Sequence, residues 1–220
     1  MSIRKTPFVP GEYFHIYNRG NDKRKIFHDS NDYNYFLKLL FLSNSKRNFK
    51  VRDIEDTYSI DRGEQLVHLG AYCAMPNHFH LLVSPTEESG ISKFMQKLST
   101  GLSMHYNTKY KRTGVLFEGK FKAEHANDDT HLKYLFSYIH LNPIKLLQSD
   151  WKENGIKNLD KAKDYLKKYY FSSYLDYLQE VRPENLIINR DSFPNYFPDK
   201  NSFENEILDW ISLNTQARPV

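Results

Sequence analysis

Hydrophobic and polar positions recur with clear periods along the first half of the chain. Residues 12–20, EYFHIYNRG, carry the aromatic and β-branched side chains of a strand and end in turn residues. After Asp29 or Ser30, either of which can cap a helix, apolar residues recur with the period of an amphipathic helix. Residues 44–65 are polar and mixed, so we expect an extended connection there with at most one short strand.

Two apolar runs come next, residues 65–74 and 77–84, and a Met-Pro-Asn turn joins them. This pattern predicts a hairpin of two strands that face a core. Residues 89–110 have a helical apolar stripe that contains Gly101. A glycine inside a helix costs about 1 kcal/mol relative to alanine. Gly101 therefore marks a position where we expect another segment to approach the helix backbone closely.

The pattern then predicts a strand over residues 115–126, broken at Gly119, and a third helix that begins at Asp128 or Asp129 and ends before Pro143. Strand, helix, hairpin, helix, strand is the order of a ferredoxin-like α+β fold, an antiparallel sheet with helices on one face. We assign this fold to a domain of residues 1–149. Residues 150–220 are expected to form a helical C-terminal extension, with helices near 159–179 and 202–213.

Composition narrows the class of protein. The single cysteine, Cys73, excludes an internal disulfide framework, and no run approaches the roughly 18 apolar residues of a membrane-spanning helix. We expect a soluble, cytoplasmic protein with no membrane partner. The net charge is +4, and its excess lies in residues 1–25 (six basic, two acidic) and 93–122 (seven basic, one acidic). Two basic clusters of this kind favour a nucleic-acid partner.

Four residues are candidates for chemistry. His78 and His80 point to the same side of a predicted strand, where they either pack against the sheet or bind one metal ion. Two histidines do not complete a zinc site, which needs three or four ligands. Tyr138 and Asn142 lie one turn apart on the third helix, and the Asn142 oxygen beside two imidazoles suits Mg²⁺ or Mn²⁺. Tyr138 is either a nucleophile or a core residue, and spacing alone leaves both readings open.

Four stretches resemble one family. MPNHFHLLVSP, followed about sixty residues later by YLFSYIHLNPIKLL, resembles the single-tyrosine transposases of the HUH endonuclease superfamily, most closely the REP-associated tyrosine transposases. FHIYNRGNDKRKIF and LFEGKFKAE resemble that family's first strand and its basic strand before the catalytic helix. Together these stretches cover most of residues 11–147.

The resemblance implies a role for each candidate. His78 and His80 match paired metal ligands, Tyr138 matches the nucleophile, and Asn142 matches the polar residue that completes the metal site. The implied enzyme uses Mg²⁺ or Mn²⁺ to cut and rejoin single-stranded DNA beside a hairpin through a 5′-phosphotyrosine. Its basic stretches would bind backbone phosphates; the residues are Arg19, Lys23, Arg24, Lys120 and Lys122.

Other readings of the sequence remain open. A ferredoxin-like sheet with basic and aromatic residues also suits a non-catalytic module that binds single-stranded nucleic acid, including a domesticated transposase. A zinc hydrolase would need a further ligand, which the sequence does not reveal. We treat His15 and His68 as structural residues, and the sequence leaves the choice between monomer and homodimer undecided.

Overall fold

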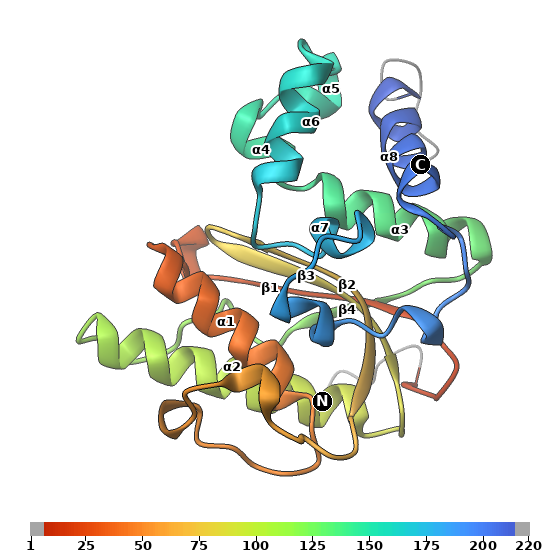
Figure 1. The fold of residues 1–220 in the computed structure, drawn as a ribbon. Coiled ribbons are helices and arrows are strands. Elements are labelled where there is room, and N and C mark those ends of the chain that lie inside the picture. Colours follow the sequence, from red (N-terminus) through yellow and green to blue (C-terminus); the bar gives the residue numbers. More distant parts are fainter. Residues whose placement is uncertain (1–6, 214–220) are drawn as a thin grey trace.

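The elements of the first 142 residues follow the predicted order. The computed structural model describes residues 7–213 (Figure 1). In chain order the elements are β1 (Phe14–Arg19), α1 (Ser30–Ser43), β2 (Val67–Met75), β3 (His78–Pro85), α2 (Gly90–Lys109), β4 (Lys122–His125) and α3 (Asp129–Leu141).

The four strands form one antiparallel sheet in the order β2-β3-β1-β4. In this order β3 of the hairpin pairs with β1, β2 forms one edge of the sheet, and β4 pairs with the other side of β1. The predicted α+β class and the ferredoxin-like arrangement of the sheet are confirmed. The register pairs Tyr17 with His80 and Arg19 with His78, so these four side chains share one face of the sheet.

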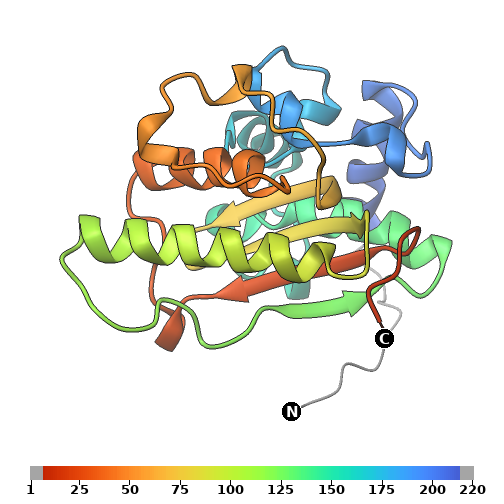
Figure 2. The ribbon, with the colours of Figure 1, turned by 90° about the horizontal axis from the view of Figure 1, so that it is seen from below.

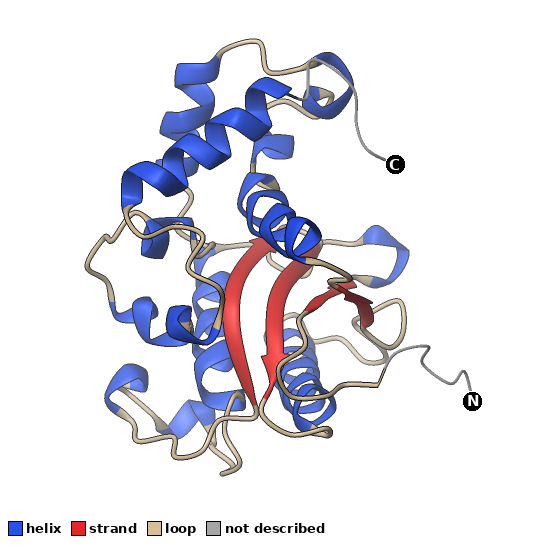
Figure 3. Cartoon of the chain, turned by 90° about the vertical axis from the view of Figure 1, so that its right-hand side faces the viewer, coloured by secondary structure: helices blue, strands red, loops and turns tan. Residues whose placement is uncertain are grey.

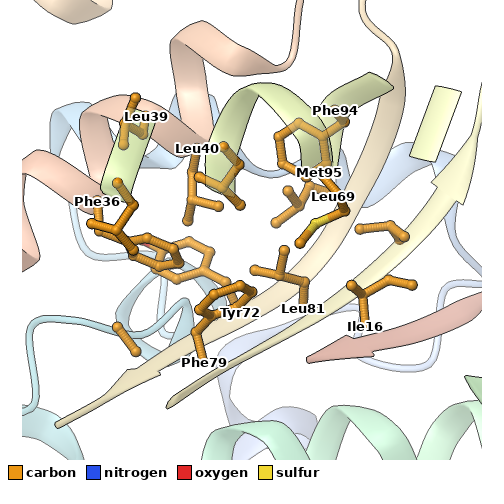
Figure 4. Close-up of a cluster of buried hydrophobic side chains, with 14 of the residues drawn as sticks. Ile16, Phe36, Leu39, Leu40, Leu69, Tyr72, Phe79, Leu81, Phe94 and Met95 are labelled. Atoms are coloured by element: carbon orange, nitrogen blue, oxygen red, sulfur yellow. The ribbon is translucent and has the colours of Figure 1, made fainter. Parts of the chain in front are cut away.

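Helices cover both faces of this sheet, whereas the sequence pattern predicted them on one face. α1 and α2 pack on one face, where they bury Phe79 and Leu81 of β3 (Figures 2 and 4). α3 lies on the opposite face with the C-terminal helices (Figures 1 and 3). Leu82 of β3 is buried in the cluster on that side. The reason is visible in β3, whose apolar residues run continuously after His80 and therefore point to both sides.

Local signals explain where the helices begin. Asp29 caps α1 through its side chain, which accepts a hydrogen bond from the Asp32 amide, and Asp128 caps α3 in the same way. A Cβ placed on Gly101 of α2 would lie 2.7 Å from a methyl group of Leu39 in α1. The predicted close approach at this glycine is therefore confirmed.

Two segments differ from the predicted pattern. Within residues 44–65 the structure has two short 3-10 turns, Val51–Asp53 and Thr57–Ser59, and no strand. The strand expected over residues 115–126 is limited to β4, although Phe117 still forms an isolated bridge to Gly20. The strand is interrupted around Gly119, as predicted. The Gly119 carbonyl accepts a hydrogen bond from the Asn18 side chain.

The C-terminal extension contains more helices than the two expected; the second expected helix is present as α8 (Lys200–Leu213), whereas the first is divided. The first of these two ends at Lys168 because residues 171–173 then run along the edge strand β2. There the Ala74 amide donates to the Phe171 carbonyl, and the Ser173 amide donates to the Tyr72 carbonyl. These bonds cover an otherwise open sheet edge. The helices after α3 are α4 (Ile144–Leu147), α5 (Trp151–Asn154), α6 (Leu159–Lys168), α7 (Tyr174–Tyr177) and α8 (Lys200–Leu213).

In residues 7–213 we find no helix that combines the length and the apolar character needed to cross a membrane.

Candidate active site

The candidate residues meet on the face of the sheet that α3 covers. The rings of His78 and His80, on β3, have centroids 4.9 Å apart and lie nearly perpendicular, at 89°. The ring of Tyr138, on α3, has its centroid 5.5 Å from that of His80. The structure thus brings together three residues that lie up to sixty positions apart in the chain.

Both histidines are held in the neutral form. Burial, together with the positive charges of Arg19 and Lys145, lowers the pKa of His78 to about 4. Burial also lowers the pKa of His80 well below its usual value, and neighbouring His15 and His78 act in the same direction. A neutral imidazole keeps a lone pair, which is the form that binds a metal ion.

Hydrogen bonds define which ring nitrogens are free. Nδ1 of His78 lies 2.6 Å from Oδ1 of Asn77, an oxygen that only accepts, so Nδ1 carries the proton. Nδ1 of His80 lies 2.8 Å from Nε2 of His15. If the proton of the His15 ring is on Nδ1, which faces Glu124, then Nε2 of His15 accepts a hydrogen bond from Nδ1 of His80. His78 and His80 then each keep an unprotonated Nε2. This arrangement is expected of a metal ligand whose other ring nitrogen is held by a second partner.

His15 belongs to this constellation, although the sequence analysis treated it as a structural residue. Its Nδ1 lies 3.6 Å from a carboxylate oxygen of Glu124 on β4. Tyr17 donates a 2.8 Å hydrogen bond to the other oxygen. The close approach of His15 and the hydrogen bond from Tyr17 lower the pKa of Glu124 to about 2, so this carboxylate is charged at neutral pH. The alternation His15, Tyr17, Arg19 along one strand face was the available signal, but its partners depend on the sheet register.

Tyr138 is half-buried between the histidines and the extension. Burial raises the pKa of its phenol, as do Tyr134 and the negative charge of Glu124. The phenol is therefore protonated at rest. Lys152, on α5, has its Nζ 4.4 Å from the centroid of the Tyr138 ring. This lysine is not among the site residues predicted from the sequence.

Asn142 caps the C-terminus of α3 and is 2% exposed. Its Nδ2 donates a 2.9 Å hydrogen bond to the Tyr138 carbonyl, which ties it to the turn that carries the tyrosine. Its Oδ1 is buried and has no hydrogen-bond partner. An orphaned carbonyl oxygen of this kind costs free energy unless something binds it.

These donors fit a hard divalent cation. Within residues 7–213 we find no cluster of three or more His, Cys, Asp and Glu side chains able to hold a metal ion. The Asn142 side chain offers a carbonyl oxygen, and oxygen ligands suit Mg²⁺ and Mn²⁺. A ring bound through its nitrogen at about 2.1 Å has its centroid about 3 Å from the ion, so a separation of 4.9 Å allows both histidines to share one ion.

The five basic residues predicted to bind DNA divide into two groups. Arg19 and Lys122 are exposed on the candidate-site face, and the sheet register places them opposite His78 and Tyr17. Lys23 and Arg24 lie in and just after the 3-10 turn that follows β1, while Lys120 is exposed in the segment before β4. The Arg24 guanidinium already donates to the Asn21 carbonyl and to Asp22.

The sequence matches a family of transposases. The model of the family described as "Transposase IS200 like" matches residues 9–142, more than half of the chain, and the protein therefore belongs to this family. Among solved structures, the fold is similar to that of a REP-associated tyrosine transposase bound to a REP hairpin. That match has a TM-score of 0.52 and 12% identity, and it covers 84% of this chain and 90% of the other. No curated protein sequence gives a significant match.

Proposed function

We propose that the protein is a metal-dependent endonuclease and strand transferase for single-stranded DNA, acting at hairpin-forming sites through a 5′-phosphotyrosine. The observation that carries this proposal is the approach of the Tyr138 ring to the His78–His80 pair on a buried sheet face, with centroids 5.5 Å apart for Tyr138 and His80. Membership of the transposase family supports DNA transposition as the setting of the reaction.

The chemistry assigns one step to Tyr138. Its phenol loses a proton and its oxygen attacks the scissile phosphorus; a P–O bond forms to Tyr138 and the bond to the 3′ oxygen breaks. The 3′ oxygen leaves with the electron pair and takes a proton. Rejoining reverses these steps, so it needs no external energy source.

His78, His80 and Asn142 are the residues that would hold the cation. Bound there, Mg²⁺ or Mn²⁺ would supply Lewis-acid polarisation of the phosphodiester. The neutral state of both histidines and the unpartnered Oδ1 of Asn142 support this assignment. His15, held by Glu124, would orient the His80 ring through its contact with Nδ1 of His80.

The DNA is proposed to bind across the same face. The similar solved structure contains a REP hairpin, and a hairpin here would place backbone phosphates near Arg19 and Lys122. We assign Lys23, Arg24 and Lys120 to the more distant backbone. We further propose that residues 1–149 form the catalytic domain and that 150–220 form an extension with a role at the same site.

A covalent-trapping assay tests the proposal. The protein is incubated with labelled single-stranded hairpin oligonucleotides in Mn²⁺, Mg²⁺ or EDTA, and adducts are separated on a denaturing gel. We expect a metal-dependent adduct that Tyr138→Phe abolishes while hairpin binding is kept, since only the nucleophilic oxygen is lost. Adduct formation by Tyr138→Phe would contradict the assignment of the nucleophile. Tight metal-independent binding without any adduct would favour a non-catalytic binding module.

A further inference from the structure

The segment that follows α3 brings two positive charges back to the candidate site. Lys152 of α5 lies with its Nζ 4.4 Å from the Tyr138 ring centroid. Lys145 of α4 follows Asn142 directly in space, since its amide donates a 3.1 Å hydrogen bond to the Asn142 backbone carbonyl. Neither lysine belongs to the matched family region, which ends at residue 142.

The position of Lys152 is built into the fold. Its neighbour Trp151 is 2% exposed and belongs to the buried cluster that also contains the apolar residues of α3, so the start of α5 is anchored in this core. Gln148 ties the two ends of the α5 segment together, since its side chain donates to the Gly155 carbonyl at 2.7 Å and accepts from the Lys157 amide at 3.0 Å. Lys152 therefore lies beside Tyr138 because the backbone holds it there.

The charges around Tyr138 suit an anion. The carboxylate of Glu124, on the same face of the sheet, is already engaged by His15 and Tyr17. Lys145 and Lys152 add two positive charges on the side of the site nearest the extension. A phosphodiester that reaches the Tyr138 oxygen brings one negative charge, and the reaction places further negative charge on its oxygens.

We propose that Lys152, supported by Lys145, forms a phosphate subsite that binds the scissile phosphodiester and then the phosphotyrosine. The inference rests on the proposed function and extends it by giving the C-terminal extension a part in the active site. Lys152 acts through its charge; it forms no covalent bond and transfers no proton. It orients the phosphate toward Tyr138 and offsets the charge that develops on the non-bridging oxygens.

The first test compares rates of adduct formation at saturating hairpin DNA. Lys152→Gln is expected to slow formation at least tenfold while hairpin affinity changes less than threefold. Lys152→Arg keeps the charge and should stay within about threefold of the wild type. Lys157→Gln removes an exposed lysine from the same segment and serves as the matched control, with an unchanged rate. A rate for Lys152→Gln equal to that of the control would overturn the proposal.

The second test needs no catalysis. Lysines of the Tyr138→Phe variant, which leaves the DNA intact, are reductively methylated and quantified by mass spectrometry. An oligonucleotide that extends from the hairpin through the cleavage site should protect Lys152 at least fivefold, whereas the hairpin stem alone should not. Equal methylation of Lys152 with and without the extended oligonucleotide would overturn the subsite.

The two tests separate this inference from the proposed function. If the wild type forms no adduct, the proposed cleavage reaction fails, and the methylation pattern alone then decides whether Lys152 contacts the DNA. If the wild type forms the adduct and Lys152 is neither protected nor needed for the rate, the reaction stands and the subsite is wrong.

Discussion

Some residues of the candidate site can be recognised from their spacing in the sequence, whereas others can be recognised only from the folded structure. His78, His80, Tyr138 and Asn142 carry a recognisable pattern, because His-x-His fixes two side chains on one strand face and i, i+4 fixes two on one helix face. His15 carries no such pattern. Its contact with His80, at 2.8 Å, arises from strand pairing.

His15 provides the first prediction at this scale. His15→Leu removes the group that meets Nδ1 of His80, and loss of such a second partner lowers metal affinity about 10–100-fold. Calorimetric titration of the DNA-free protein with Mn²⁺ measures this directly. His68→Leu is the matched control, because His68 lies near the far end of β2, opposite Ser84, and should leave the affinity unchanged. An affinity unaffected by His15→Leu would show that His15 only packs beside the site.

Sequence reasoning missed Glu124 and Lys152 for the same physical reason. Glu124 is one acid in a basic strand, and it reaches His15 only because β4 pairs with β1. Lys152 lies fourteen residues after Tyr138 in the sequence, beyond the end of the helix that carries the tyrosine, so no helical period relates the two. Periodicity describes contacts within an element, whereas these contacts join different elements.

At the scale of elements, the sequence predicted the long, strongly periodic ones well. β1, α1, β2, β3, α2, α3 and α8 all occur where the apolar pattern placed them. The errors fall where tertiary contacts compete with local preference. The helix expected to continue beyond Lys168 stops because its backbone is used to pair with β2, and the third helix lies on the opposite face from the one expected because β3 is apolar on both sides.

α3 is the element whose stability bears most directly on the site, and its N-terminal cap offers a prediction. The Asp128 carboxylate accepts a 2.7 Å hydrogen bond from the His131 amide. Asp128→Ala leaves that amide unpaired and should lower the free energy of unfolding by about 1 kcal/mol. Asp128→Asn keeps an accepting oxygen and should retain most of the stability. Urea unfolding of the two variants measures the difference; equal midpoints would show that the cap contributes nothing.

At the scale of the whole molecule, the extension and the sheet share one buried cluster. Arg182 and Asp176, both from the extension, form a buried ion pair, and the Arg182 guanidinium also donates to the Tyr72 hydroxyl of β2. Removal of either member of this buried ion pair would be strongly destabilising, because one unpaired buried charge costs several kcal/mol. This contact joins residues 110 positions apart, a separation over which the pattern of a single sequence carries no information.

The buried histidines make the stability of the whole molecule depend on pH. Burial lowers the pKa of His78 to about 4 and of His140 to about 3, and it lowers the pKa of His80 well below the usual value. An unfolded histidine has a pKa of about 6.5, so below that pH the unfolded chain binds more protons than the folded one. The stability that these residues contribute is fully present above pH 6.5 and is lost as the pH falls toward 4.

We therefore expect the urea midpoint to decrease steadily from pH 6.5 to pH 5. Each histidine lowers the free energy of unfolding by at most about 1.4 kcal/mol per pH unit, and less for His78, which solvent partly screens. Asp32 and Glu124, whose pKa values in the folded protein lie at about 2, contribute little to the slope, because carboxyls of the unfolded chain titrate at about pH 4, below this window. The slope of the unfolding free energy against pH is proportional to the number of protons taken up on unfolding. His140→Gln should reduce that number by about one, because it removes one histidine that is neutral in the folded protein. A midpoint that stays constant from pH 7.5 to pH 5 would mean that the folded protein takes up these protons, and the two histidines beside Tyr138 would then be charged rather than poised to bind a cation.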